Sequence, residues 1–308
     1  MFRIAAPGGV EIGRNGLKLA GGEENNYEFL FNPSCTRKRR KVLMKAPFLA
    51  AVALVAIALT AAAQTGPTST LYLTASQNGQ NSIVVVQGNS ITSFPEAYGS
   101  PTEGPIAVWG DVRTTGWDHN EPYGGQYTLS GTPTGTTYVL PSAITGGYSW
   151  AFDSTSDGSH NYLISWNTGV VYQTARDFTN PTGLFYAGGE GITYDAANNS
   201  LWTSGTGPTV ADYSLSGTLL SSFNTGHYYN YALALDPEDQ TLWLMNALTG
   251  NLEQYSQAGV LLSIGPYLGG AYGAEFDLAP TTPEPGTLIM FCSGILGLAG
   301  VLRRKINL

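Results

Sequence analysis

Four residues with acidic, basic or aromatic side chains stand together near the middle of the chain, at Trp117, Asp118, His119 and Glu121. A pair of carboxylates is what a glycosidase needs for general acid and base or nucleophile, and an aromatic ring offers a flat face on which a sugar can stack. This segment is therefore a candidate ligand-binding loop. A solvated insertion without function explains the same residues.

A second acidic segment, DSTSDGSHN, resembles the first half of a calcium-binding loop. It places oxygens at Asp153, Thr155 and Asp157 and a glycine at Gly158, but its twelfth position is Ile164 instead of the bidentate glutamate of an EF-hand. The segment predicts no more than weak Ca²⁺ binding, and no other cofactor is expected.

Aspartates also recur at one place in three repeated segments, at Asp153, Asp195 and Asp236. Such a series could line one face of the molecule and bind cations. Because each is followed by a turn rich in Gly, Asn or Asp, we expect these side chains to accept backbone N–H groups.

Patterns typical of other enzyme classes are missing from the sequence. The three histidines belong to no zinc motif, both cysteines lie near the chain ends, and there is neither a nucleophile elbow nor a phosphate-binding glycine loop. We therefore expect a protein that is not an enzyme. A secreted glycan hydrolase or lyase is the alternative.

The charge of the chain is distributed unevenly. Residues 64–285 contain two arginines, no lysine and 18 acidic residues, which is a net charge of −16. A surface of this kind repels phosphate backbones and anionic lipids, which excludes nucleic acid as a partner. An extracellular polysaccharide or a surface protein is the expected ligand.

The same region repeats itself about every 42 residues. YDAANNSLWTS (194–204) matches LDPEDQTLWLM (235–245), and DYSLSGTLLSSF (212–223) matches QYSQAGVLLSI (254–264). One position, expected in the last strand of each unit, recurs at Val86, Tyr127, Tyr172, Tyr213 and Tyr255. Trp166 lies close to the place that Trp243 occupies. Short β-branched and aromatic runs between turn signals indicate strands.

Five such units of four strands resemble a repeat β-propeller, an all-β fold. The segment 270–280 matches an early strand without its later partners, whereas residues 71–86 supply later strands without an early one. Both chain ends should therefore complete one blade, which removes two free sheet edges. A β-sandwich or β-solenoid, and a degenerate extra blade at residues 95–125, are the alternatives. Tyr228, Tyr229 and Tyr231 should start a blade near the central channel, as ligand contacts.

The last residues of the chain have the layout of a membrane address. Residues 286–302 carry no charge and as a helix would extend about 25 Å, close to a bilayer core of about 30 Å. Arg303, Arg304 and Lys305 follow as cytoplasmic anchors. Pro283, Glu284 and Pro285 precede this run. A plain membrane anchor is the alternative interpretation.

These three parts resemble the PEP-CTERM sorting signal. The resemblance implies a Gram-negative bacterium that makes exopolysaccharide, and an exosortase-type transpeptidase that cleaves at the triplet. The body would then pass from a transient membrane anchor to the cell surface or the extracellular matrix.

The beginning of the chain predicts export through the inner membrane. Lys45, the apolar run 48–59 and the small residues Ala61 and Ala63 form a signal peptide at 44–63, cut by signal peptidase before Gln64. Residues 1–43 lack periodicity and are expected to be a disordered or non-native extension. The expected domains are thus 1–43, 44–63, a propeller at 64–280 and a sorting signal at 281–308.

Overall fold

The computed structural model describes residues 66–77, 80–98, 103–117, 120, 122–145 and 150–280. The predicted signal peptide, the residues on either side of its cleavage site (Ala61, Ala63 and Gln64) and the C-terminal helix lie outside these ranges, as do Asp118, His119 and Glu121. No helix in the described ranges is long and apolar enough to cross a membrane.

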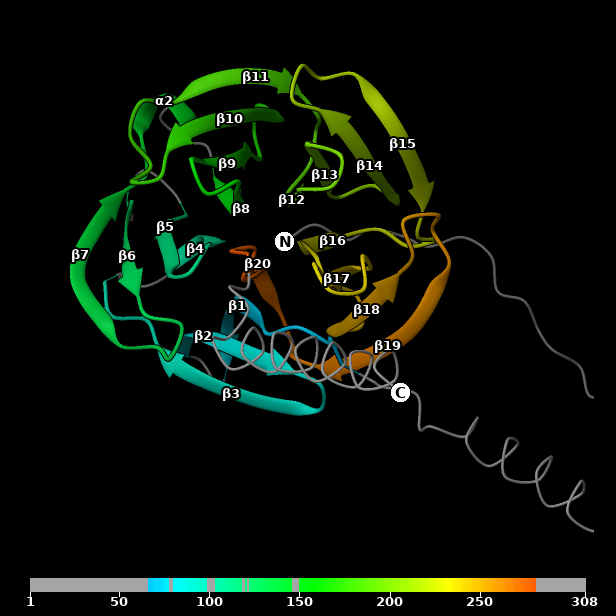
Figure 1. The fold of residues 1–308 in the computed structure, drawn as a ribbon, viewed down its shortest axis with the longest axis horizontal. Coiled ribbons are helices and arrows are strands. Elements are labelled where there is room, and N and C mark those ends of the chain that lie inside the picture. The colour runs from blue at the N-terminus through cyan, green and yellow to red at the C-terminus, as the bar shows by residue number, and fades with distance from the viewer. Residues whose placement is uncertain are drawn as a thin grey trace, which may run out of the picture. The chain divides into compact units, whose positions relative to one another are not determined.

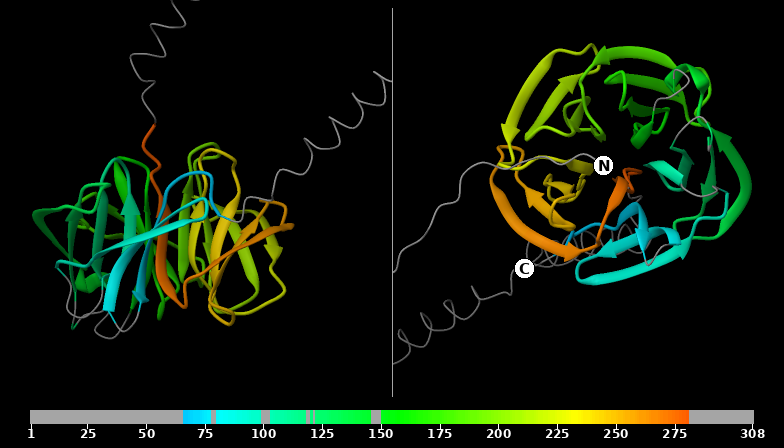
Figure 2. Two further views of the ribbon diagram at one scale, coloured as in Figure 1. Left: turned by 90° about the horizontal axis from the view of Figure 1, so that it is seen from below. Right: turned by 180° about the vertical axis from the view of Figure 1, so that it is seen from behind.

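The described strands form five sheets of four antiparallel strands each, arranged as blades around one axis (Figures 1 and 2). The prediction of a five-bladed β-propeller is confirmed. The described residues between 95 and 125 form no extra blade, since they contribute β4, β5 and the start of β6 to the second blade.

Each blade is named here by its strands. Blade 1 contains β20 (Ala271–Phe276), β1 (Leu71–Gln77), β2 (Gln80–Gln87) and β3 (Ser90–Pro95). Blade 2 contains β4 (Glu103–Val108), β5 (Val112–Gly116), β6 (Tyr123–Tyr127) and β7 (Pro133–Val139), and the short helix α2 (Ser142–Thr145) follows it. Blade 3 contains β8 (Ala151–Ser156), β9 (His160–Ser165), β10 (Val170–Ala175) and β11 (Thr182–Tyr186). Blade 4 contains β12 (Gly191–Asp195), β13 (Ser200–Ser204), β14 (Thr209–Ser214) and β15 (Leu219–Asn224). Blade 5 contains β16 (Asn230–Leu235), β17 (Leu242–Asn246), β18 (Asn251–Tyr255) and β19 (Leu261–Tyr267).

Burial decreases from the axis outward. The innermost strands β4, β8, β12, β16 and β20 contact one another around the centre (Figure 1). β13 and β17 are buried at every position, whereas the outermost strands, such as β3 and β15, are exposed along nearly their whole length. This gradient follows from the architecture, because a blade can bury its two faces only against its neighbours.

The core consists of apolar layers between adjacent blades. Large side chains at one position of the second strand fill four of these layers, namely Tyr72, Tyr162, Trp202 and Trp243, all at most 4 % exposed. Trp202, for example, packs with Leu233 and Leu244 of blade 5. The sequence predicts that Trp166 lies close to this position in blade 3. Tyr162 occupies it instead.

The ring is closed by both ends of the described chain, as predicted. β20 pairs with β1 in antiparallel register, from Leu71 opposite Phe276 to Ala75 opposite Ala271. The approach to β1 is also fixed to blade 5, because both carboxylate oxygens of Asp236 accept hydrogen bonds from Ser69, and Oδ2 also accepts one from the N–H of Thr68. No blade is left incomplete.

A repeated glycine explains the recurring phrase that ends in Ser-Gly-Thr or Ala-Gly-Val. Gly131, Gly217 and Gly259 have φ between 83° and 85° in the turn before each outermost strand. A Cβ atom on each of them would lie 2.5 Å from a phenylalanine ring or Cβ in the preceding blade. Blade 3 has Phe178 in this turn instead, at φ 61°, and its own ring packs on Tyr138 of blade 2.

The repeat alignment is correct for four blades and wrong for blade 3. Val86, Tyr127, Tyr213 and Tyr255 share one register, but on the third strand of the blade and not on its last. In blade 3 this register is held by Thr174, two positions after Tyr172.

The two arginines of residues 64–285 are used within the fold. Arg113 on β5 and Arg176, after β10, both bind the carboxylate of Asp111, each with a nitrogen–oxygen distance of 2.8 Å. Arg113 also donates to the backbone carbonyl of Arg176 at 2.9 Å. These contacts join blade 2 to blade 3 and leave neither cation of the ring free.

Candidate functional site

Six aromatic side chains meet at the end of the ring where the innermost strands begin. We call them the entrance cluster. Four blades provide them: Trp117 follows β5, Trp150 precedes β8, Phe152 lies on β8, Trp166 follows β9, Tyr231 lies on β16 and Tyr272 lies on β20.

The rings form one continuous set of contacts. Trp150 stacks on Trp166 with centroids 4.8 Å apart and on Trp117 with centroids 5.7 Å apart. Phe152 lies at the middle of the cluster, 6.0 to 6.2 Å from the rings of Trp117, Tyr231 and Tyr272. Aromatic pairs at these distances attract each other by about 0.5–1.5 kcal/mol each.

Unlike the tryptophans buried between the blades, the entrance cluster is partly open to solvent. Trp166 is 40 % exposed, and the other five members are of intermediate burial. Trp202 and Trp243, by comparison, are at most 1 % exposed. A group of partly exposed aromatic rings at the axis of a propeller is typical of a ligand-binding surface.

The loop before β16 extends this surface outward. Tyr229 is 44 % exposed, and its ring contacts Tyr231 edge-on at 6.3 Å. Its φ is 64°, which is a strained conformation for a bulky side chain and is concentrated in proteins at functional positions. Tyr228 beside it is 59 % exposed.

A buried acid lies beside the cluster. Glu190, just before β12 of blade 4, is 2 % exposed. Burial raises its pKa to about 7, and the adjacent indole of Trp166 opposes part of this rise. Burial, and then the charge of Glu190, also raise the pKa of the Tyr231 hydroxyl to about 12. Glu190 therefore lies within electrostatic reach of two members of the entrance cluster.

Below the cluster, polar side chains fill the axis. The Asp153 carboxylate accepts hydrogen bonds from the backbone of Ser154, Ile192, Leu233 and Ala274, at 2.9 to 3.1 Å. These donors belong to four different blades. Burial raises the pKa of Asp153 and of Glu275 well above the ordinary range, and for Glu275 the neighbouring Asp153 adds to this effect.

The calcium-like segment is distributed over separate hydrogen-bonding sites. Thr155 Oγ1 accepts the N–H of Tyr194, and Asp157 accepts the N–H groups of Ser159 and His160. Among the described residues no group of three or more His, Cys, Asp or Glu side chains could hold a metal ion.

The aspartate series belongs to turns, but its blade 3 member is Asp157 and not Asp153. Asp195 accepts the N–H groups of Ala197 and Asn198, and Asp236 accepts that of Glu238. Asp157 caps its own turn in the same way, whereas Asp153 lies four residues earlier on β8. The turn interpretation is thus confirmed for Asp195 and Asp236, and the placement of Asp153 was wrong.

The sequence-based ligand candidates are partly brought together. Trp117 and Tyr231, 114 positions apart, both contact Phe152. Sequence reasoning missed Trp150, Phe152, Tyr272 and Glu190, and placed Trp166 close to the repeat position of Trp243. One signal was available, because Trp150 and Trp166 do not fit the repeated tryptophan position of Trp202 and Trp243.

Two described histidines have acidic partners: His160 lies 3.3 Å from Asp157, and His227 lies beside Glu253. His227 Nε2 lies 2.7 Å from Glu253 Oε2, and Glu253 also accepts hydrogen bonds from Tyr255 and Asn246 at 2.8 Å. This group lies beside the tyrosine loop. Because Glu253 is only 6 % exposed, the contact serves to fasten that loop to blade 5.

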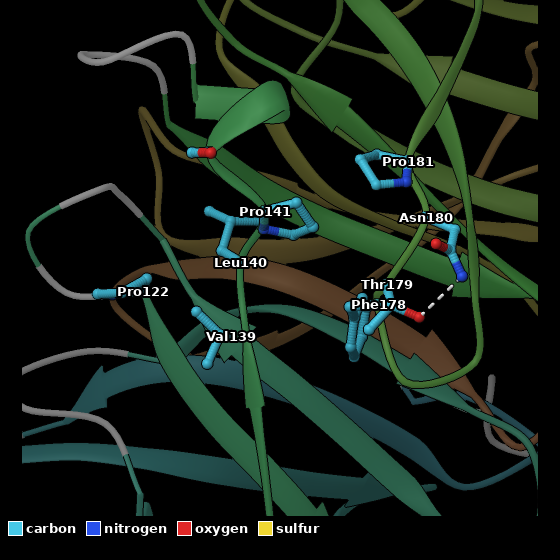
Figure 3. Close-up of a pocket in the computed structure, with 9 residues that line it drawn as sticks. Pro122, Val139, Leu140, Pro141, Phe178, Thr179, Asn180 and Pro181 are labelled. Carbon is cyan, nitrogen blue, oxygen red and sulfur yellow. Dashed lines mark hydrogen bonds between the residues drawn. The ribbon is translucent and has the colours of Figure 1, made fainter.

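Two surface pockets lie away from the entrance cluster. One, between β7, α2 and the turn before β11, has a mainly apolar lining that includes Pro122, Leu140 and Phe178 (Figure 3). The polar residues of this lining include Asn180, whose side-chain amide donates a hydrogen bond to the hydroxyl of Thr179 at 3.3 Å. The other, lined by Thr68, Glu238 and Asp277 among others, is at the opposite end of the ring. The first has no ionisable side chain in its lining, so it has no group for acid–base chemistry.

Comparison with known protein families identifies the C-terminal part of the chain. The PEP-CTERM protein-sorting motif matches residues 281–305, which include the Pro-Glu-Pro triplet and the three terminal cations. This motif implies export, membrane-associated sorting and processing by an exosortase-type enzyme. No curated protein matches the sequence.

Several solved structures are similar to part of the chain at low sequence identity. Glutaminyl cyclase of Myxococcus xanthus is 17 % identical, with a TM-score of 0.42, covering 53 % of this chain and 69 % of that one. Virginiamycin B lyase of Staphylococcus aureus is 17 % identical (TM-score 0.40; 60 % and 62 % covered). The WD40 β-propeller domain of Doa1 is 11 % identical (TM-score 0.40; 65 % and 67 % covered). The chain therefore carries a C-terminal PEP-CTERM sorting motif on a body folded as a five-bladed β-propeller.

Proposed function

We propose that this is a non-catalytic protein of the cell surface or extracellular matrix, and that it binds polysaccharide at the entrance cluster. The observation that carries this proposal is the partial exposure of six touching aromatic rings at the ring axis. Flat apolar faces beside a few polar groups complement the faces and hydroxyl groups of sugars.

The position of the cluster relative to the sorting motif supports this role. Residues 66–70 and 277–280 lie at the end of the ring where the innermost strands finish (Figure 2). The entrance cluster lies at the end where these strands begin. The sorting motif begins at residue 281, directly after Pro280. A chain held through this motif would present the entrance cluster away from the point of attachment.

Affinity electrophoresis of the full chain through gels containing neutral, acidic or amino polysaccharides tests the proposal. We expect at least one polymer to retard the protein, and Trp150→Ala to weaken its binding about tenfold or more, equal to about 1.4 kcal/mol. Tyr267→Ala is the matched control, because Tyr267 is an aromatic residue 70 % exposed on β19, at the rim of the ring. Equal retardation of both variants, or none of the wild type by any polymer, would contradict binding at this cluster. A protein partner captured through Trp150 would replace polysaccharide as the ligand.

A glycan hydrolase or lyase is the second candidate, and one observation favours it. The pKa of Glu190, raised by burial to about 7, lies in the range that suits a general acid at neutral pH. Incubation with the retarding polymers should release no new reducing or unsaturated ends if the protein only binds. Release that Glu190→Gln abolishes would establish the enzyme instead.

A further inference from the structure

Glu190 differs from the other deeply buried glutamates in having no hydrogen-bonding partner of normal geometry. Neither of its carboxylate oxygens accepts such a bond from any residue that the structure describes. Glu103 and Glu253 are also deeply buried, and each accepts a hydrogen bond from one tyrosine hydroxyl. Tyr127 donates to Glu103 at 2.7 Å, and Tyr255 donates to Glu253 at 2.8 Å. The fold thus satisfies these two carboxylates fully, whereas Glu190 has only the indole of Trp166, which lowers its pKa without reaching good hydrogen-bond geometry.

The backbone holds Glu190 firmly in this place. Its N–H donates to the carbonyl of Ser204 at 2.5 Å. The adjoining Gly189 and Gly205 pack so closely that a Cβ atom on Gly205 would lie 3.0 Å from the Cα of Gly189. The backbone of Glu190 is therefore held beside the entrance cluster, so a ligand must displace side-chain atoms of the cluster to reach its carboxylate. A buried carboxylate without a charged partner is costly.

A cation supplied by a ligand would relieve this cost, because the described residues offer no unpaired arginine and no lysine. Both arginines of residues 64–285 bind Asp111, and this range contains no lysine. The indole faces of the neighbouring tryptophans also attract cations, by about 0.5–2 kcal/mol. The Glu190 carboxylate and the indole faces beside it therefore both favour a ligand that carries a positively charged group.

Building on the function proposed above, we propose that the entrance cluster recognises polysaccharides with free primary amino groups, whose ammonium pairs with Glu190. A neutral sugar hydroxyl could donate one hydrogen bond to this carboxylate but could not neutralise its charge. Anionic polymers are disfavoured by the net charge of −16. The raised pKa of Glu190 agrees with this role, since an arriving ammonium would favour the ionised carboxylate.

Two oligosaccharides that differ only at the amino group provide the test. Calorimetric titration of the full chain would compare a glucosamine hexamer with the N-acetylglucosamine hexamer, at a pH where the amine is protonated. We expect the wild type to bind the amino form at least about tenfold more tightly. Glu190→Gln should reduce this ratio to near one. Glu238→Gln, at an exposed acid at the opposite end of the ring, should leave it unchanged.

The outcomes separate this inference from the proposed function. Equal affinity of the wild type for both hexamers, or a ratio unchanged by Glu190→Gln, would overturn the amino-sugar inference while glycan binding stands. If the full chain binds neither hexamer and no polysaccharide, the proposed function itself fails. Tight Glu190-dependent binding of an oligolysine peptide without binding of either hexamer would reject the sugar and assign the site to a basic protein.

Discussion

The indoles of Trp117 and Trp150 stack with their centroids 5.7 Å apart and their planes 7° from parallel, which joins blade 2 to blade 3 at the entrance of the ring. Trp117 ends a second strand and Trp150 precedes an innermost strand. The contact is therefore part of the packing between blades as well as part of an exposed surface. Members of the entrance cluster differ in how much each contributes to packing between blades and how much to the exposed surface.

Substitutions of Trp166 and Trp243 should have different effects on stability, because only Trp243 belongs to the core between the blades. Trp166 is 40 % exposed, whereas Trp243 is fully buried between blades 5 and 1. We expect Trp243→Ala to lower the free energy of unfolding by about 3–5 kcal/mol. Trp166→Ala should cost less, at about 0.5–1.5 kcal/mol for each of its two ring contacts, with Trp150 and Phe152. Denaturant unfolding followed by circular dichroism measures both, and equal losses would argue against an open site at Trp166.

Gly217 should tolerate no side chain. Its φ is 84°, and a Cβ atom there would lie 2.5 Å from the Cβ of Phe185. Gly217→Ala should therefore destabilise the fold by about 1–3 kcal/mol, as overpacking does. Gly207→Ala is the control, because Gly207 is in the same blade, its φ is outside the left-handed region and no atom lies within 4 Å of an added Cβ. A harmless Gly217→Ala would show that the repeated glycine is not needed for contact between blades.

Stability should decline as the pH rises through neutrality. Burial raises the pKa of Glu96 from 4.5 to about 8, and the charge of Glu103 adds to this rise. Between these two values the folded protein binds a proton that the unfolded chain has released, so the free energy of unfolding falls with increasing pH. Glu190 acts in the same direction up to about pH 7.

Thermal unfolding between about pH 5 and pH 8 measures this effect. The melting temperature of the wild type should fall across the range, and Glu96→Gln should flatten the curve. A melting temperature that rises over this range would mean that Glu96 is ionised in the folded protein.

Processing at both ends should be visible in the intact mass of the protein from the surface of its host. We expect a chain that begins at Gln64 and ends within Pro283 to Pro285, because signal peptidase and an exosortase-type enzyme each remove one segment. A mass that still includes residues 286–308 would contradict cleavage at the triplet and indicate a permanently anchored propeller.

The repeat of about 42 residues was enough to predict the blades and their closure. Each unit carries the same order of strand and turn signals, and these are local properties that a sequence displays directly. The first turn of blade 3 has only two residues, Gly158 and Ser159, where blades 4 and 5 have four, and this accounts for two of the four positions by which Asp153 was misplaced. A fixed spacing therefore assigned Asp153 and Tyr172 to places that belong to Asp157 and Thr174.

The sequence by itself determined the fold class, the closure of the ring and the sorting motif, because all three are recorded in periodicity or in adjacent residues. The site was decided by the tertiary structure. The entrance cluster and Glu190 come from positions between 117 and 272 on all five blades, and only closure of the ring brings them to one axis. An aromatic side chain is buried between blades or exposed at the entrance according to how far along the ring axis its strand ends. The repeat spacing of the sequence does not show this position along the axis.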